Sequence, residues 1–584
     1  MASSDDKSAA LPAAWSACAA LAMAAPSLLA FNLPPSATFL NQAAALVGWG
    51  GFALVLTTRL SAQRWRGSSG SVSLFAALAL LLIAAVVAPL WAGLPWSLAW
   101  SGAGMILGAA LVVLVAATMQ VGGSGDAAFR AFCIGLVAAG VASSAIGIVQ
   151  VFAPEWPDGE WIARTYIPGG AVGNMRQPNH LSSLLVWSVI GAAWLIERGT
   201  LRRWFGSALV LLFVFVIVLS GSRTGTLSVG LLAVWGLVDR RLSRGTRALL
   251  LLTPVAYAIF WFGTTAWADY SHHVVRAESR FSTKGDISAS RGKIWSNTLS
   301  LIALHPWAGV GFGEFNFAWT LTPFPDRPVA FFDHTHNVVL EFAVELGLPL
   351  AALVLALLAR ALLAAWRSAV LDPSRRAALV IVSMILLHSL LEYPLWYAYF
   401  LLPTAFAFGI CLGPTVDSAH QGAPTARPAI ARRTRPLLIA SMILMLAGVA
   451  SVVDYHRVVV IFSPPEEAPP LAQRIRDGQR SVLFGHQADY AAATTAEHPA
   501  QAMDAFRRAP HNLLDARLMM AWAKALAESG DIERARYIAQ RLKEFRNDQA
   551  VEFFAPCEAP ARHRETLPFQ CTPPTRTFTY EDFR

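Results

Sequence analysis

The chain has 584 residues, of which 55% are apolar and only 14% are charged, whereas about a quarter of the residues of a typical soluble domain are charged. This composition excludes an ordinary soluble globular protein and favours one embedded in a membrane. The net charge of +9 does not indicate a nucleic-acid partner, because the basic residues lie mostly in short loops between apolar runs and no nucleic-acid-binding motif accompanies them.

The apolar runs predict membrane-spanning helices, because about 20 apolar residues cross the hydrocarbon core of a bilayer. The predicted spans are 13–31, 39–58, 73–92, 97–120, 129–152, 179–196, 204–220, 224–238, 247–268, 337–359, 377–391, 394–412 and 436–456. We therefore expect an all-α polytopic protein with about 13 transmembrane helices in residues 1–456. A long periplasmic loop is predicted at 269–335, and a small helical domain at 457–584.

Arginine is unevenly distributed between the predicted loops, and this asymmetry predicts the orientation. Alternate loops contain clusters of it, namely Arg59, Arg64, Arg66, Arg198, Arg202, Arg203, Arg240, Arg241, Arg244, Arg247, Arg360, Arg367, Arg375, Arg376, Arg432, Arg433 and Arg435. The short connections between these loops contain only Arg164, Arg176 and Arg223. Because cytoplasmic loops are enriched in Lys and Arg, we expect a multi-pass inner-membrane protein with a cytoplasmic N-terminus and a periplasmic C-terminal domain.

The C-terminal segment indicates a helical domain. Residues 519–546 show two helical patterns joined by a Gly-Asp turn, which resembles one tetratricopeptide unit and suits docking a partner or covering the membrane site. Its small packing positions are Ala523, Gly530 and Ala535. Cys557 and Cys571 can pair if the domain lies in an oxidising compartment, and the sequence leaves this pairing open.

The first polar segment that suits chemistry is GNMRQPNH, residues 173–180, at the start of the sixth span. The proline holds Gln177 extended, and Asn179 is expected to cap the helix. A capped helix start accounts for part of this segment. It does not account for Arg176, Gln177 and His180 gathered beside the cap.

The second and third polar segments are basic. Arg223 lies in a tight turn, SGSRTG, where its planar guanidinium suits a carboxylate or a phosphate; the alternative is snorkelling to lipid headgroups. Arg291 and Lys293 open an amphipathic helix in the long loop. The glycines at 309–313 are expected to form an ordinary turn, because no Gly-Lys-Ser/Thr follows to make a nucleotide loop.

The fourth polar segment is DHTHN, residues 333–337, at the start of the tenth span. Asn337, Glu341 and Glu345 are four residues apart and share one helix face, and ionisable groups within a span are functional candidates. The two histidines suit a zinc ion, but no third ligand stands out. A general base or a contact to an oxyanion is therefore favoured.

Glu392 and Tyr393 form a further polar turn, with His388 one helical turn earlier. The predicted topology places all these segments at the periplasmic end, where they would form a cationic cleft. Such a cleft suits a substrate with a membrane-buried tail and an anionic headgroup. The periplasm supplies no nucleotide, so a glycosyl donor there must already be activated on a lipid, and arginines neutralise the charge of a departing diphosphate. Since no Asp-x-Asp pair is present, we expect neither a metal nor another cofactor.

Four segments resemble the O-antigen ligase superfamily, namely GNMRQPNHLSSLL, SGSRTG, HTHNVVLEFAVELGLP and HSLLEYPLWYAYFLLP. Across roughly 165–410 the chain looks most like bacterial protein O-oligosaccharyltransferases of the PglL type, and its tail resembles the C-terminal domain of that subgroup. The Gln-Pro-Asn-His segment is the discriminating signal. The resemblance implies en bloc transfer of a glycan from undecaprenyl diphosphate to a serine or threonine of a periplasmic protein such as a pilin.

The resemblance also implies roles for individual residues. His336 would be the essential catalytic histidine, and Arg223 and Arg291 would hold the diphosphate. The remaining substrate-binding candidates are Arg176, Gln177, Asn179, His180, His334, Asn337, Glu392 and Tyr393. The sequence does not decide between His334 and His336; we prefer His336 because it directly precedes Asn337 and the helix start.

Three other functions stay open. An O-antigen ligase, with lipid A core as acceptor, and an O-antigen polymerase would use the same donor and cleft. A flippase or transporter for a lipid-linked glycan belongs to a different class. It is disfavoured because the sequence shows no internal repeat and its ionisable groups gather at one face, whereas transporters combine repeats with midplane sites.

Overall fold

The computed structural model describes residues 13–58, 60, 68–121, 123–275, 291–370, 372–413, 431–558 and 567–584, and the backbone alone at 431–434. All regular elements in these ranges are helical, with no strand among them. Arg59, Arg64 and Arg66 lie outside the described residues, as does the middle of the predicted 269–335 loop.

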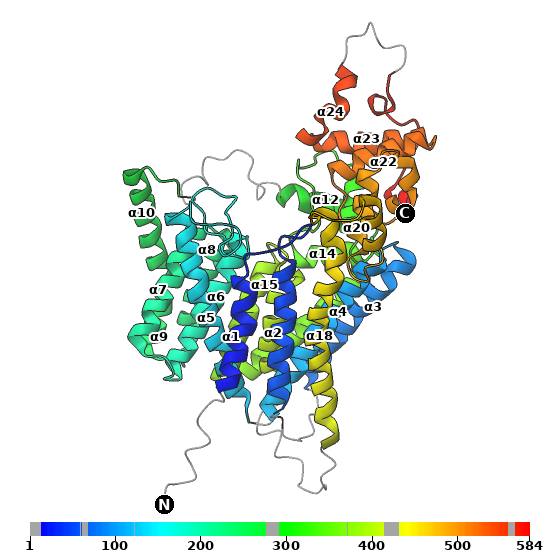
Figure 1. The fold of residues 1–584 in the computed structure, drawn as a ribbon. Coiled ribbons are helices and arrows are strands. Elements are labelled where there is room, and N and C mark those ends of the chain that lie inside the picture. Colours follow the sequence, from blue (N-terminus) through cyan, green and yellow to red (C-terminus); the bar gives the residue numbers. More distant parts are fainter. Residues whose placement is uncertain are drawn as a thin grey trace, which may run out of the picture. The chain divides into compact units, whose positions relative to one another are not determined.

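The chain forms two compact units, each assembled from three separate stretches of sequence (Figure 1). Unit 1 comprises Met1–Ala76, Leu107–Thr283 and Leu357–Val452, and unit 2 comprises Ala77–Ile106, Lys284–Ala356 and Val453–Arg584. Four of the five boundaries between these stretches fall within long helices, namely α3 (Ser69–Trp91), α4 (Trp96–Val121), α14 (Val338–Ala369) and α18 (Ala431–Phe462). The fifth, after residue 283, lies outside the described residues. The predicted domain boundary at residue 456 stays a prediction.

The other helices of unit 1 are α1 (Ala13–Leu28), α2 (Phe39–Thr57), α5 (Gly125–Phe152), α6 (Pro178–Glu197), α7 (Arg203–Ser220), α8 (Arg223–Val238), α9 (Arg244–Leu251), α10 (Thr253–Ser271), α15 (Pro373–Ser389), η3 (Pro394–Trp396) and α16 (Ala398–Leu412). Those of unit 2 are α12 (Arg291–Leu304), α13 (Phe315–Leu321), α19 (Leu471–Gly478), α20 (Gly485–Thr495), η4 (Pro499–Ala502), α21 (Met503–Phe506), η5 (Ala509–His511), α22 (Ala516–Glu528), α23 (Ile532–Phe545), η6 (Asp548–Ala550), α24 (Val551–Phe554), η7 (Ala555–Glu558), η9 (Phe569–Cys571) and η10 (Tyr580–Phe583).

Each predicted span coincides with a helix or a pair of helices. Within the described ranges, nine helical stretches are long and apolar enough to cross a membrane, and α1, α8 and α16 are shorter apolar helices. The predicted all-α, polytopic membrane class is therefore confirmed, whereas the number of 13 spans stays a prediction. The span predicted at 247–268 is two helices, α9 and α10, which meet at Leu252 just before Pro254, because proline lacks the N–H that would continue a helix.

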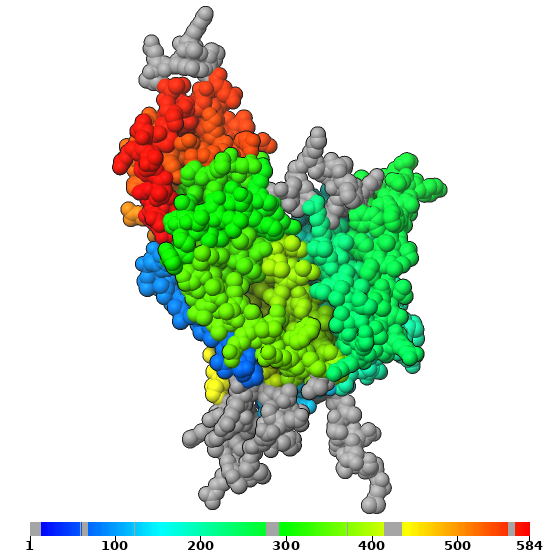
Figure 2. Space-filling view, turned by 180° about the vertical axis from the view of Figure 1, so that it is seen from behind, coloured from blue at the N-terminus to red at the C-terminus, as the bar shows by residue number. Residues whose placement is uncertain are grey.

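Helix α6 is the centre of unit 1. It packs against α5, α7, α8 and α15, and every residue from 180 to 196 is buried. By contrast, α10 lies at the edge of this unit, where Val255, Ile259 and Phe262 are exposed (Figure 2). An apolar outer face of this kind suits contact with lipid. The buried α6, by contrast, fixes the positions of the residues at its two ends.

A close approach between helices α5 and α6 holds α6 in place. Ser188 on α6 donates a hydrogen bond from its Oγ to the carbonyl oxygen of Leu136 on α5, over 2.8 Å. The approach requires glycine on α5, because a Cβ at Gly140 would lie only 2.4 Å from the Oγ of Ser188. Small residues let membrane helices come close enough for such contacts.

Unit 2 is built around the short helix α13, all of whose residues are buried. Helices from the C-terminal segment, namely η5, α23 and η10, pack against it. The Oδ1 of Asn316 accepts a hydrogen bond from the backbone N–H of Leu514 over 2.7 Å, and His511 Nδ1 lies 2.7 Å from a carboxylate oxygen of Glu314. The C-terminal segment therefore shares one polar and apolar core with residues 305–332.

The glycine-rich segment at 309–313 is more than an ordinary turn. Helix α14 is kinked at Gly347, which has a positive φ of 75°, and the kink leaves carbonyl groups of the preceding turn without helical partners. The backbone N–H of Val310 donates to the oxygen of Val344 over 2.8 Å, and that of Gly311 donates to the oxygen of Glu345 over 3.0 Å. The segment thus satisfies the carbonyls that the kink exposes.

The predicted helical hairpin of the tail is present as α22 and α23. Ala523 and Ala535 are fully buried, as their predicted packing role requires. Gly530 is different, because it is exposed and a Cβ there would meet nothing within 4 Å. Its φ of 88° shows that glycine is needed for the left-handed turn instead. Cys557 and Cys571 form a disulfide, which settles the pairing that the sequence left open.

We expect Gly140→Ala to destabilise the protein, because its new methyl group would overlap Ser188 and push α5 and α6 apart. Overpacking of this kind typically costs about 1–3 kcal/mol. The matched control is Gly230→Ala, since Gly230 lies inside α8 and a Cβ there would meet nothing within 4 Å. The melting temperature of each purified variant in the same detergent measures the effect. A Gly140→Ala protein as stable as the control would contradict the close approach.

Candidate functional site

The start of α6 is fixed by Gln177. Its backbone is extended, with φ −146° and ψ 123°, and its side-chain Oε1 accepts a hydrogen bond from the backbone N–H of His180 over 2.8 Å. Pro178 occupies the first helical turn, where its missing N–H costs nothing. The cap predicted for Asn179 is therefore wrong: Gln177 caps the helix, and Asn179 is left for other contacts.

Asn179 connects three segments that are far apart in the sequence. Its Oδ1 accepts a hydrogen bond from the Oγ of Ser222 over 2.5 Å, and its Nδ2 donates to Oε1 of Glu392 over 3.1 Å. We call these three residues the Asn179 bridge. Ser182, one turn along α6, adds a hydrogen bond from its Oγ to that of Ser222 over 2.9 Å. Three of the predicted polar segments thus meet in unit 1.

Arg223 is positioned by the same serine. Gly221 ends α7 in the left-handed conformation, and the Oγ of Ser222 caps α8 by accepting from the N–H of Gly225. Arg223 is therefore the first residue of α8, and it is exposed. The sequence identified the arginine but not the serine, because a serine next to an apolar run has no distinctive pattern.

The guanidinium of Arg176 contacts the protein backbone. Its Nη2 donates to the carbonyl oxygen of Ala30 over 2.7 Å, while its Nε is buried without a hydrogen-bond partner among the described residues. Its φ of 58° is unusual for a residue other than glycine. Strained backbone of this kind clusters at functional sites, which keeps Arg176 a candidate.

A buried aromatic layer lies beneath the Asn179 bridge. His180 is only 4% exposed, and its Nδ1 lies 3.2 Å from the hydroxyl of Tyr399. Ser183 Oγ lies 2.8 Å from Nδ1 of the buried His388. Tyr393, beside Glu392, stacks on Tyr397 with ring centroids 6.0 Å apart. The burial of His180 favours a role in positioning the start of α6.

In unit 2, the DHTHN segment is folded around Glu341. One carboxylate oxygen, Oε1, lies 3.2 Å from Nδ1 of His334, and the other accepts the backbone N–H of Thr335 over 2.7 Å. Glu341 and Glu345 are 2% and 5% exposed. The carboxylate of Glu341 thus holds the turn that leads into α14.

The surroundings of His334 favour the charged form of its imidazole. Burial alone would lower the pKa of its imidazole, but the negative charge of Asp333, the hydrogen bond with Glu341 and the charges of Glu341 and Glu345 outweigh burial. Together they raise the pKa of His334 from 6.5 to about 9. A charged His334 cannot accept a proton, so the general-base role suits His336 better.

His336 and Asn337 differ in what they contribute. His336 has a φ of 57°, again in the left-handed region, and its ring lies edge-on to Phe332 with centroids 5.6 Å apart. Asn337 caps α14, because its Oδ1 accepts the N–H groups of Val339 and Leu340 over 3.0 and 3.2 Å. Asn337 therefore has a structural role as the cap of α14, and this role also fixes the direction of His336.

Arg291 is the first described residue of α12 and is half-buried. The same helix is tied to the DHTHN segment, since Nε1 of Trp295 donates to the carbonyl oxygen of Thr335 over 3.0 Å. Lys293 forms an ion pair of 2.8 Å with Asp326. Arg291, His334 and His336 are therefore part of one arrangement in unit 2. That all four polar segments converge stays a prediction.

Three protein families match separate stretches of the chain. Residues 208–355 match the family described as O-Antigen ligase, and residues 376–553 match the family described as Virulence factor membrane-bound polymerase, C-terminal. Residues 171–196 match the family described as Protein glycosylation ligase. The last stretch contains the start of α6 and Asn179, so the match includes the central residue of the Asn179 bridge.

Two relatives from Acinetobacter baylyi support the same assignment. One, named General O-oligosaccharyltransferase, is 27% identical over 260 residues, which are 43% of this chain and 45% of the relative. The other, named ComP-specific O-oligosaccharyltransferase, is 25% identical over 244 residues, 41% of this chain and 44% of the relative. The chain spans less than half the length of each relative. Family matches and relatives together support one assignment: the chain is similar to proteins of the O-antigen ligase superfamily, and over residues 171–196 to their protein glycosylation ligases.

Proposed function

We propose that this protein is a membrane oligosaccharyltransferase that transfers a glycan en bloc from undecaprenyl diphosphate to a serine or threonine of a periplasmic protein such as a pilin. The observation that carries the proposal is the Asn179 bridge. It joins the segment matched by the protein glycosylation ligases to the turn that presents Arg223 and to Glu392.

The proposed reaction is a single displacement at the anomeric carbon of the lipid-linked sugar. The acceptor oxygen forms a bond to that carbon, and the bond from carbon to the diphosphate oxygen breaks, its electron pair leaving with the diphosphate. His336 takes the proton of the acceptor hydroxyl. Arg223 and Arg291 neutralise the charge that develops on the leaving group. Arg176, Gln177 and Tyr393 stay candidates for binding the substrate.

The proposed orientation places the tail and the Asn179 bridge in the periplasm of a bacterium, with the N-terminus in the cytoplasm. Two observations support it. The loops at the opposite end of unit 1 contain clustered arginines such as Arg198, Arg241 and Arg376. The tail contains the Cys557–Cys571 disulfide, a bond that forms in oxidising compartments.

The proposed function is tested in cells that make one defined lipid-linked glycan and contain both a pilin-type acceptor and lipid A core. We expect glycan on the protein, and a loss of about a hundred-fold or more with His336→Asn. Asparagine tolerates the left-handed backbone at this position, so the variant should fold, and its melting temperature checks this. The control is His498→Ala at an exposed position of the tail.

Other products would redirect the assignment. Glycan on lipid A core alone would identify an O-antigen ligase, and chain extension of the glycan would identify a polymerase. A folded His336→Asn protein with normal transfer would remove His336 from the mechanism. If a folded His334→Gln protein then lost transfer, His334 would be the histidine that the reaction requires.

The Asn179 bridge predicts a compensating pair of substitutions. Asn179→Asp replaces the amide that donates to Glu392 with a second carboxylate, so we expect transfer to fall at least ten-fold. Adding Glu392→Gln restores a donor facing an acceptor, and activity should recover if Glu392 serves to hold Asn179. Glu392→Gln alone is the control. If the double variant stays as inactive as Asn179→Asp, the contact between Asn179 and Glu392 does not explain the loss, and one of the two residues acts in another way.

The raised pKa of His334 predicts that stability depends on pH. Because the pKa in the folded protein is above the ordinary value of 6.5, the stabilisation from the charged ring is complete below pH 6.5 and is lost as pH rises through about 9. We expect the melting temperature to fall over this range, and to fall less in His334→Gln. Equal pH profiles for the two proteins would show that the ring is not charged in the folded state.

A further inference from the structure

A cavity lies in unit 1 at the end opposite the Asn179 bridge. Its volume is about 100 Å³, and it is lined by Trp194, Glu197, Arg198, Trp235, Asp239, Arg241, Leu242, Pro373 and Arg376. Asn179 and Glu197 are at opposite ends of α6, and 18 residues of helix separate them by roughly 27 Å. We call this space the arginine-end cavity. It is too far from the Asn179 bridge to belong to the same site.

The two carboxylates of the arginine-end cavity already have partners. Asp239 Oδ2 accepts from Nε of Arg376 over 2.9 Å and from Nε1 of Trp235 over 3.3 Å. Glu197 accepts from Ser243 through both its Oγ and its backbone N–H, over 2.5 and 3.0 Å. These carboxylates hold the walls of the cavity together, and their acceptor capacity is largely used.

Several hydrogen-bond donors of the same cavity are not used. Arg376 contacts Asp239 through Nε, which leaves its two terminal amino groups. The guanidinium of Arg241 has neither a hydrogen bond nor an ion pair to any described residue. Trp194 is 2% exposed, yet its Nε1 has no partner in the described structure. A buried donor without an acceptor costs free energy, so an acceptor in the cavity would relieve this cost.

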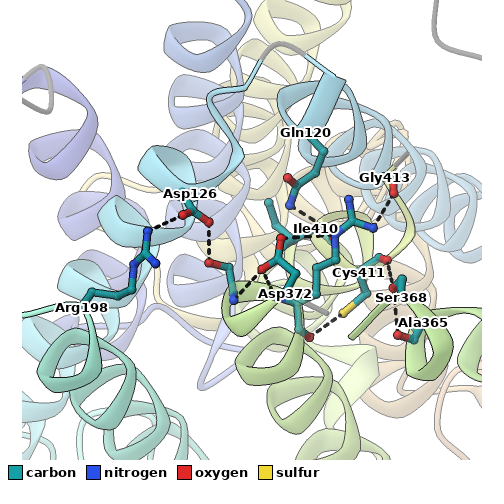
Figure 3. A network of polar contacts seen from close by, with 11 residues as sticks. Gln120, Asp126, Arg198, Ala365, Ser368, Asp372, Ile410, Cys411 and Gly413 are labelled. Carbon is teal, nitrogen blue, oxygen red and sulfur yellow. Dashed lines mark hydrogen bonds and ion pairs between the residues drawn. The ribbon is translucent and has the colours of Figure 1, made fainter. Parts of the chain in front are cut away.

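The arginines of the cavity also suit an anion. Three arginines line it against two carboxylates. Arg376 is paired with Asp239 and Arg198 with Asp126, which leaves Arg241 as the lining arginine without an ion pair to a described residue. Arg198 is held over the ring of Trp194, with 5.7 Å between the guanidinium carbon and the ring centroid, and it bonds Asp126 over 2.5 Å (Figure 3). Arg198 and Arg376 are therefore held in position before any ligand arrives, whereas the exposed guanidinium of Arg241 makes no such contact with the described part of the chain. The planar guanidinium suits a phosphate.

We propose that the arginine-end cavity binds the phosphate group of an anionic ligand, and that in the membrane this ligand is an anionic phospholipid. Next to Asp239, Leu237 and Val238 are 60% and 63% exposed and offer an apolar surface for acyl chains. Basic pockets between helices at the membrane surface are typical sites for such headgroups. The proposal is independent of the transfer reaction and of which residues carry it out.

The test uses the full-length protein in neutral detergent and native mass spectrometry with equal amounts of phosphatidylglycerol and phosphatidylcholine. We expect one retained phosphatidylglycerol on the wild-type protein. Arg241→Gln should weaken its binding about ten-fold or more, as expected for one charge-assisted hydrogen bond. The matched control is Arg240→Gln, which removes the same charge from the neighbouring residue outside the cavity. Trp194→Phe, which removes only the indole N–H donor and part of the ring, should also weaken binding.

Inorganic phosphate tests whether the cavity binds a free phosphate ion as well as the phosphate group of a phospholipid. If added phosphate displaces the phospholipid from the wild-type protein but does not bind Arg241→Gln, the cavity recognises phosphate itself and also accepts the free ion. If phosphatidylcholine is retained equally, or if Arg240→Gln weakens binding as much as Arg241→Gln, the arginine-end cavity is not the binding site and the proposal is wrong.

Discussion

The burial of helix α6 from His180 to Ile196 is the constraint on which unit 1 depends. A polar group buried without a partner is costly, and in a helix bundle within hydrocarbon that partner must come from the protein. Along the middle of α6 this need is met by small contacts, such as the hydrogen bond from Ser188 to Leu136. At its first turn, Asn179 meets the need through Ser222 and Glu392. At its last turn, Glu197 meets it through Ser243.

The residues of the Gln-Pro-Asn-His segment have separate structural roles at the start of α6. Proline holds Gln177 extended, so the glutamine amide caps the helix. Asn179 can then face away from the backbone and join side chains from two other segments, and His180 fills the aromatic layer beneath. If Asn179 were the cap, its oxygen would be occupied by the backbone, and the contact with Ser222 would not form.

The parts that were predictable from the sequence are those with a local cause. Apolar runs located the helices of the bundle, and the Gly-Asp turn located the hairpin of α22 and α23. Ser222 was not found, because its partner Asn179 is 43 residues away and a serine in a turn is ordinary. The kink of α14 at Gly347 was also missed, although Pro349, which has no N–H to donate to the carbonyl oxygen of Glu345, lies just beyond it in the sequence.

Contacts within unit 2 give the C-terminal segment a structural relation to the candidate catalytic histidine. Asn316 accepts a hydrogen bond from the backbone of Leu514 and donates one to the carbonyl oxygen of Phe332 over 2.8 Å. Phe332 in turn contacts the ring of His336. Because His336 has a left-handed backbone, which only a well-fixed surrounding maintains, the residues that hold the preceding turn matter to its direction. The tail therefore supports the segment that presents His336.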